Sequence, residues 1–258
     1  MCGHNYFLEI KNGVILTNKY INNVINADAM LEMPKMQNKS IDLIFADLPY
    51  GTTDCAWDKK LPTKELFAHF NRLLKPNGAI LLFAQQPFAT ELINAAGRMF
   101  RYQIIWEKAN ATGFLNAKRM PLRAHEMILV FYNRLPTYNP QMTPGKPYVS
   151  KDKRRNKSSV YKFNHKPTTI VNNGYRYPRD VVRFNIGAED GRHHPTQKPL
   201  ALCRWGILTY SNTGDIVFDP TCGSGSIPVA AKQTDRRFIS FDTDAGHVAT
   251  ANLRLNTL

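Results

Sequence analysis

The sequence predicts an α/β protein with a doubly wound, mostly parallel seven-stranded sheet, into which a small basic segment is inserted. Two observations support this fold class. Short apolar, β-branched runs alternate along the chain with segments whose apolar residues recur at helical spacing. Several runs (IDLIFAD, AILLF, DIVFD) are almost continuously apolar, as are strands buried on both faces of a parallel sheet.

Seven runs are expected to form strands and three segments to form helices. The strands are placed at Val24–Asp28, Ile41–Asp47, Gly78–Phe83, Tyr102–Glu107, Glu126–Tyr132, Asp215–Asp219 and Phe238–Asp242. The helices are placed at Thr63–Lys75, ended by a Pro-Asn-Gly turn, and at Pro199–Ser211 and Ser226–Thr234. Because the alternation fails at 133–193, we expect 1–132 and 194–258 to be the two halves of one domain, separated by an insert.

Length and composition limit the class of protein. The 258 residues are 43% hydrophobic and 21% charged, ordinary values for a chain that buries a core. The longest apolar stretch is about six residues, far short of the roughly 20 that span a bilayer. The segment at 1–5 lacks the basic and apolar regions of a signal peptide, and the four cysteines form no CxxC pair. We therefore expect a cytoplasmic globular protein without a disulfide framework, a zinc ribbon or a membrane partner.

The positive charge is concentrated in the predicted insert. The chain has 34 Lys plus Arg against 20 Asp plus Glu, a net charge of +14. Residues 133–193 hold 13 of these Lys and Arg residues and 4 of these Asp and Glu residues. Such an excess attracts nucleic acid, although a solubilising surface is the alternative. Aromatic residues are interleaved with the cations, which favours phosphate pairing and base stacking over a disordered loop. The candidate nucleic-acid contacts are Lys151, Lys153, Arg154, Arg155 and Lys157.

The first chemical motif is Asp47-Leu48-Pro49-Tyr50-Gly51, directly after an expected strand. Ligands of open α/β sheets bind beyond the carboxyl ends of the strands. Pro49 holds Leu48 extended, so the Leu48 carbonyl cannot join a helix. A carboxylate, a fixed carbonyl and an aromatic ring suit a planar amine, whereas an ordinary strand-ending turn is the alternative.

The second motif is the segment 219–226, DPTCGSGS, between a strand and an Ala-rich helix. Paired glycines there let a ligand approach the backbone and the helix N-terminus, although tight turns also use glycine. The next strand ends in Asp242. Its distance in sequence from the glycines is that of an acidic residue that binds the ribose hydroxyls of a nucleoside cofactor. Pro228 stands where a dinucleotide fingerprint has its third glycine, which favours a nucleoside such as S-adenosylmethionine over NAD.

The third motif is the segment 193–199, HHPTQKP, which opens a helix. Its two adjacent histidines lack an evident third ligand, so no metal site is expected. Its hydroxyl, amide and ammonium groups suit a small carboxylate instead.

Together the three motifs resemble those of a known enzyme family. Asp47–Tyr50 resembles the (D/N)PPY motif of the amino-methyltransferases that modify DNA bases. The segment 219–226 resembles their DPFxGSG cofactor loop, and the segment 194–199 resembles their HP(T)xKP stretch. The order of catalytic motif, basic insert and cofactor loop is similar to that of the β group of these enzymes. The resemblance extends from Val24 to about Leu255 and implies a Rossmann-like methyltransferase sheet.

Carried over by position, the resemblance implies two sets of site residues. Asp47, the Leu48 carbonyl, Pro49 and Tyr50 would hold the target base. The cofactor would be bound by Asp28 at the adenine, by Asp242 at the ribose, and at the methionine end by Thr196, Lys198, Asp219, Gly223, Gly225 and Ser226. Two positions depart from the family pattern: Leu48 replaces a proline, and Thr221 replaces the usual phenylalanine.

The resemblance also implies the reaction. A methyl group would pass from S-adenosylmethionine to the exocyclic N6 amine of a flipped-out adenine in double-stranded DNA. The aspartate at position 47 is typical of the adenine enzymes, and N4-cytosine methylation is the main alternative. An RNA methyltransferase and an inactive DNA-binding relative are further alternatives. A homodimer and a cognate restriction nuclease are partners that the residues neither require nor exclude.

Overall fold

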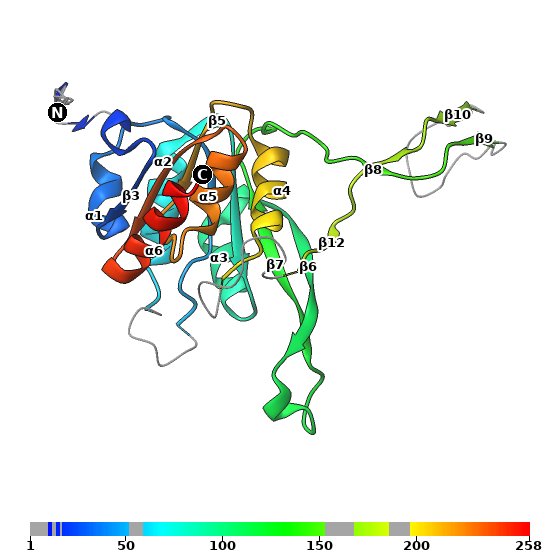
Figure 1. Cartoon of the computed structure of the whole chain (residues 1–258), viewed down its shortest axis with the longest axis horizontal. Coiled ribbons are helices and arrows are strands. Elements are labelled where there is room, and N and C mark those ends of the chain that lie inside the picture. The colour runs from blue at the N-terminus through cyan, green and yellow to red at the C-terminus, as the bar shows by residue number, and fades with distance from the viewer. Residues whose placement is uncertain (1–9, 12–13, 16, 52–58, 153–167, 186–196) are drawn as a thin grey trace. The chain divides into compact units, whose positions relative to one another are not determined.

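The computed structural model describes residues 10–11, 14–15, 17–51, 59–152, 168–185 and 197–258 of the chain. The chain divides into two compact units (Figure 1). The larger unit combines Met1–Asn139 with Asp180–Leu258, and the smaller unit is Pro140–Arg179. The smaller unit therefore lies inside the segment 133–193 that the sequence predicts to be an insert.

The larger unit is built on a mixed sheet, of which the described residues form eight strands. Their order is β12-β6-β7-β5-β4-β13-β14-β3, and β7 alone runs antiparallel to its neighbours. All seven predicted strands are confirmed, and the eighth, β12, is a short edge strand from the predicted insert. The bounds are β3 (Asn23–Asn26), β4 (Ile41–Ala46), β5 (Leu74–Ala84), β6 (Phe100–Thr112), β7 (Arg123–Phe131), β12 (Val181–Arg183), β13 (Ile216–Asp219) and β14 (Arg237–Asp242).

Helices cover both faces of this sheet. The core on one face includes residues of α1, α2 and α3, and the core on the other includes residues of α4, α5 and α6. The three predicted helices are confirmed as α2, α4 and α5. The bounds are α1 (Ala29–Glu32), α2 (Thr63–Leu73), α3 (Phe88–Ala96), α4 (Leu200–Tyr210), α5 (Ser226–Gln233) and α6 (Ala245–Asn256), with 3-10 turns η1 (Thr17–Tyr20), η2 (Met33–Lys35), η3 (Gly97–Met99) and η4 (Phe114–Asn116).

Strand β4 shows why its sequence is almost entirely apolar. Successive side chains of a strand point to opposite faces, and both faces here are covered. Ile44 and Ala46 belong to the core beneath α2, whereas Leu43 and Phe45 belong to the core beneath α4 and α5. All four side chains are fully buried.

The predicted turn after α2 is instead an irregularity within a strand. Strand β5 already begins at Leu74, which pairs with Ile41, and the register then shifts so that Ala79 pairs with Leu43. A side chain at Gly78 would lie 2.6 Å from the Asp42 carbonyl oxygen. The glycine therefore permits a close approach between two paired strands rather than ending the helix.

The order of connections reverses between β4 and β13. The chain leaves β4 through α2 and returns on β5, whereas it leaves β13 through α5 and returns on β14, on the opposite side. Strands β4 and β13 are themselves parallel partners. Ligands of open α/β sheets bind at such a switch point, beyond the carboxyl ends of the strands. The first and second predicted motifs begin there, at Asp47 and Asp219.

The smaller unit consists of two antiparallel pairs. Strand β8 (Thr143–Pro144) pairs with β11 (Tyr175–Arg176), and β9 (Tyr148–Asp152) pairs with β10 (Thr168–Asn172). A further short pair, β1 (Ile10–Lys11) and β2 (Val14–Ile15), precedes the sheet of the larger unit. Within the described parts of the chain, no helix has the length and apolar character needed to cross a bilayer.

Candidate active site and cofactor loop

The Asp47 carboxylate lies directly after β4 and contacts two other predicted site residues. Its Oδ1 accepts a hydrogen bond from the Tyr50 hydroxyl at 3.0 Å. Its Oδ2 lies 2.6 Å from the Lys198 ammonium, which stands just before α4. The structure therefore brings the first and third motifs together at one carboxylate.

Two charged residues that sequence reasoning missed complete a cluster around Lys198. Lys198 Nζ lies 3.3 Å from Glu126 Oε2, and Lys108 forms an ion pair with the other oxygen of Glu126. Lys198 also lies over the ring of Phe83, 5.0 Å from its centroid. Two ammonium groups thus balance two carboxylates, as partly desolvated charges require.

Charges and burial act in opposite directions on this cluster. Burial raises the pKa of Asp47, and the Lys198 ammonium offsets part of the rise. Burial alone would lower the pKa of Lys198, but Asp47 and Glu126 outweigh it, so that pKa is raised. Burial likewise opposes ionisation of Glu126, yet Lys198 and Lys108 lower its pKa. Lys198 therefore stays charged, and Asp47 is the carboxyl that protonates more readily.

The other residues of the first motif are held in place by packing. The Leu48 side chain is buried in the core, 3% exposed. The Tyr50 ring packs against Phe88, the first residue of α3, with ring centroids 5.3 Å apart and a 34° angle between the planes. The backbone around Pro49 is therefore anchored on both sides by buried or packed side chains.

A hydrogen bond joins this motif to the cofactor loop. The Thr221 hydroxyl donates to the Asp47 carbonyl oxygen at 3.1 Å, and the Thr221 amide donates to Asp219 Oδ1 at 3.2 Å. The phenylalanine expected at this position in the family pattern could not make the first bond. The departure at Thr221 thus links the two loops that the switch point brings together.

Asp219 is a buried carboxylate at the start of the cofactor loop. It is 1% exposed, and burial raises its pKa well above the usual range. No basic side chain among the described residues forms an ion pair with it. A cationic ligand near this loop would supply the missing positive charge.

The two glycines of the loop have different roles. Both have left-handed backbone conformations, with φ of +51° at Gly223 and +85° at Gly225. A side chain at Gly225 would lie 2.6 Å from the Ala251 Cβ of α6, whereas one at Gly223 would meet no protein atom within 4 Å. Gly225 therefore serves helix packing, and Gly223 borders open space.

Asp242 and Asp28 stand at the carboxyl ends of β14 and β3, which are parallel neighbours. Asp242 Oδ2 accepts the Gly223 amide at 2.8 Å, so it also holds the cofactor loop. The Asp28 carboxylate accepts the Met30 amide at 2.8 Å and caps α1. Ser226, the first residue of α5, has a buried hydroxyl with no hydrogen-bond partner among the described residues.

Several predicted contacts fall elsewhere. Thr196, Lys153, Arg154, Arg155 and Lys157 lie outside the described residues. Lys151 is exposed on β9 of the smaller unit. In the same unit the Arg176 guanidinium lies 4.8 Å from the centroid of the Tyr148 ring.

One signal in the sequence could have identified Glu126. It is a charged residue at the head of the apolar run Met127–Phe131, and a carboxylate buried with such a strand requires a cationic partner. No comparable signal marks Phe88 or Lys108, because their roles depend on the pairing of strands distant in sequence.

Comparisons with known proteins agree with this geometry. A family model described as a DNA methylase matches residues 41–253, most of the chain. The DNA adenine methyltransferase YhdJ of Escherichia coli is 29% identical over 90% of this chain and 82% of its own length. The type II methyltransferase M.HpaI of Haemophilus parainfluenzae is 30% identical over 91% of this chain and 74% of its own.

Solved structures share the fold. A crystal structure of the complex of M1.HpyAVI with SAM has a TM-score of 0.63 at 24% identity and covers 91% of this chain and 98% of its own. The PvuII DNA methyltransferase, described as cytosine-N4-specific, has a TM-score of 0.63 at 14% identity and covers 90% of this chain and 85% of its own. The Rossmann-like methyltransferase sheet implied by the motifs is thus confirmed. With the family model spanning both halves of the site, this chain belongs to the N6/N4 family of DNA methylases.

Proposed function

We propose that this DNA methylase transfers a methyl group from S-adenosylmethionine to the exocyclic N6 amine of an adenine flipped out of duplex DNA. One observation carries the proposal. The base-binding motif at Asp47–Tyr50 and the cofactor loop at 219–226 meet at the switch point of the sheet, joined by the Thr221 hydrogen bond.

The described residues fit the cofactor. Asp219 is a buried carboxylate without a basic partner in the described chain, Ser226 has a free buried hydroxyl there, and Gly223 borders open space. Asp242 and Asp28 are the proposed contacts to ribose and adenine. Thr196 and Lys198 are the proposed contacts at the methionine end, together with Gly225. Bound there, S-adenosylmethionine supplies an activated methyl group on a positively charged sulfonium.

The protein's part in the reaction is positioning. The lone pair of an aromatic amine is delocalised into the ring, so the amine is a weak nucleophile. Asp47 and the Leu48 carbonyl would accept its two hydrogens, favouring a pyramidal nitrogen whose lone pair points at the methyl group. Tyr50 would stack on the flipped base and replace part of the stacking lost in the duplex. As the nitrogen gains its methyl group it must release a proton, which Asp47 would accept.

Adenine is favoured over cytosine by the aspartate at position 47, which is typical of adenine enzymes of this kind. The similarity to a DNA adenine methyltransferase over nine-tenths of the chain supports the same choice. Cytosine N4 is the second candidate, because a cytosine-N4-specific enzyme shares the fold. Both bases present an exocyclic amine to the same acceptors.

Duplex DNA is the proposed substrate, and the basic segment around the smaller unit is its proposed recognition element. The exposed Lys151 and the cation–aromatic contact between Arg176 and Tyr148 suit a surface that pairs with phosphates and stacks on bases.

The test is mass analysis of nucleosides from unmethylated duplex DNA incubated with the protein and S-adenosylmethionine. N6-methyladenine is the expected product. Detection of N4-methylcytosine instead would show that the target base is cytosine, the second candidate. Absence of any modified nucleoside across genomic DNA of varied sequence, with the cofactor bound, would contradict the proposal, and duplex RNA assayed in parallel would identify the alternative substrate.

A further inference from the structure

The hairpin formed by β6 and β7 extends well beyond the rest of the sheet and has the turn η4 at its tip (Figure 1). Strand β6 is antiparallel to β7, which is antiparallel to β5, so β6 runs parallel to β5 and β4. Its carboxyl end therefore lies on the same edge of the sheet as Asp47. The hairpin projects from the edge where the proposed chemistry occurs.

The reach of the hairpin is set by its length. Trp106 pairs with Glu126, the residue linked to Asp47 through Lys198. From Trp106 to Gly113 at the tip, a strand rise of roughly 3.3 Å per residue gives about 20 Å. The major groove of DNA is about 8.5 Å deep and admits a two-stranded ribbon. A duplex with one base at Asp47 is thus within reach of the tip.

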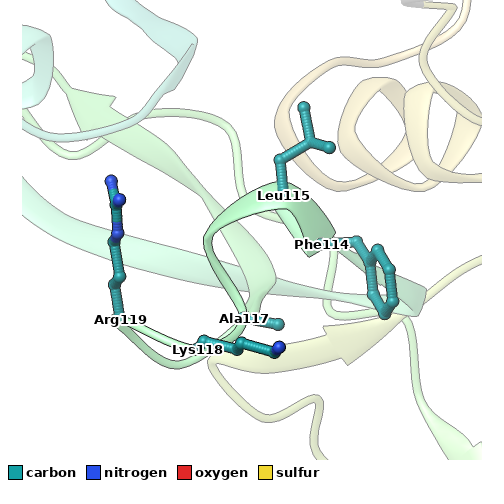
Figure 2. Close-up of a pocket in the computed structure, with 5 residues that line it drawn as sticks. All are labelled: Phe114, Leu115, Ala117, Lys118 and Arg119. Atoms are coloured by element: carbon teal, nitrogen blue, oxygen red, sulfur yellow. The ribbon is translucent and has the colours of Figure 1, made fainter.

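The chemistry of the tip suits DNA. Phe114 is 81% exposed and Leu115 is 99% exposed. Two neighbouring large apolar side chains that are exposed to water mark a candidate binding surface. Figure 2 shows both residues with Lys118 and Arg119, which line the same pocket. From residue 109 to residue 124 the sequence contains three cations and no acid. Exposed apolar side chains beside positive charge match a polyanion whose bases are stacked, such as duplex DNA, because the apolar groups can contact the bases and the cations the phosphates.

The tip is ordered by its own backbone. Gly113 has a left-handed conformation (φ +91°), and its carbonyl oxygen accepts the Asn116 amide at 2.9 Å. The Asn116 carbonyl oxygen in turn accepts the amides of Arg119 at 2.8 Å and of Met120 at 3.0 Å. Phe114 and Leu115 are thus presented on a preformed turn, which lowers the entropic cost of inserting them.

We propose that the tip of the β6–β7 hairpin enters the duplex beside the target nucleotide. Phe114 and Leu115 act as an apolar wedge in the base stack, while Lys118 and Arg119 pair with the flanking phosphates. Proteins that open or kink DNA insert such apolar side chains between base steps. This inference rests on the proposed DNA substrate and adds a second protein contact to base flipping.

The experiment uses the full chain and a duplex containing a site first mapped with the wild-type enzyme. The variant is Phe114→Ala/Leu115→Ala, and the matched control is Leu253→Ala, at an exposed leucine of α6. We expect the double variant to keep the wild-type melting temperature and cofactor affinity and to methylate the paired duplex at least about tenfold more slowly, because opening a base step is costly. The control should match the wild type.

A second substrate isolates the wedge. On a duplex whose target adenine faces an abasic position, opening costs less, so the double variant should recover most of the wild-type rate. Wild-type rates on the paired duplex, or an equal reduction on both substrates, would overturn the proposal. If the wild-type enzyme itself modified no DNA, the proposed function would fail instead, which separates the two failures.

The proposed phosphate pairing has its own readout. Lys118→Gln/Arg119→Gln should weaken binding of the same duplex and reduce the slope of log affinity against log salt by up to about 1.8, or roughly 0.9 per neutralised phosphate. An unchanged slope would remove these two residues from the interface.

Discussion

The Lys198 ammonium lies 2.6 Å from Asp47 Oδ2, although 151 residues separate the two in the chain. The same ammonium lies 3.3 Å from Glu126. One cation therefore joins the end of β4, the start of β7 and the start of α4 at the proposed catalytic carboxylate. Its position suggests that Lys198 controls the ionisation of Asp47 in addition to its proposed contact with the cofactor.

The pH dependence of turnover tests this control. Burial raises the pKa of Asp47 and Lys198 holds it down, so Lys198→Met should raise that pKa further. Because an ionised Asp47 is needed to accept the proton that the amine releases, activity should be lost at a higher pH as the solution is acidified. The measurement is kcat against pH at saturating substrates. Lys35→Met, at an exposed surface pair, is the control, and an unmoved acid limb in Lys198→Met would contradict the role.

Asp47→Ala should separate chemistry from cofactor binding. The alanine removes both acceptor oxygens of the side chain, so we expect turnover to fall by about 100-fold or more. Cofactor affinity, measured by calorimetry, should stay at the wild-type level. Near-normal turnover would show that Asp47 is not the amine acceptor.

Asp242→Ala should have the opposite pattern. It removes the proposed ribose contact and also the acceptor of the Gly223 amide, so the cofactor loop loses a support. We expect the Kd for S-adenosylmethionine to rise by about tenfold, as loss of a hydrogen bond to a charged group does. Turnover at saturating cofactor should fall much less. An unchanged Kd would exclude Asp242 from the cofactor site.

Gly225→Ala and Gly223→Ala form a matched pair. Both place a side chain at a positive φ, at a cost of roughly 1 kcal/mol, but only Gly225 has Ala251 in the way. Gly225→Ala should therefore lower the free energy of unfolding by about a further 1–3 kcal/mol. Urea denaturation measures the difference. Equal destabilisation of the two variants would contradict the packing role of Gly225.

Salt dependence tests the basic segment of the insert. Replacing Lys153, Arg154 and Arg155 by Gln should weaken DNA binding and reduce the slope of log affinity against log salt, by roughly 0.9 for each phosphate that is no longer neutralised. A control with the same change in net charge replaces the exposed Lys19, Lys35 and Lys64 by Gln. If both variants shift the slope equally, the segment acts through net charge and not through local pairing with phosphates.

Local patterns in the sequence were sufficient for most of the fold. The seven strands and three helices were predictable because apolar periodicity is a property of neighbouring residues. Helices α1, α3 and α6 were not predicted. In α6 the buried residues, Ala251, Arg254 and Leu255, include a charged one and form a weak apolar pattern. Arg254 is buried because its guanidinium donates to the Ser224 carbonyl oxygen at 2.5 Å, across a separation of 30 residues in the chain.

The sequence by itself determined the three motifs and the place of the first two after strands, because residue types and their spacing are written along the chain. Only the tertiary structure decided which of these residues meet. The pairing of β4 with β13 brings Thr221 to Asp47, and the position of β7 beside β5 brings Glu126 to Lys198. Such contacts join residues far apart in sequence, and they depend on strand order and register, which no local pattern specifies.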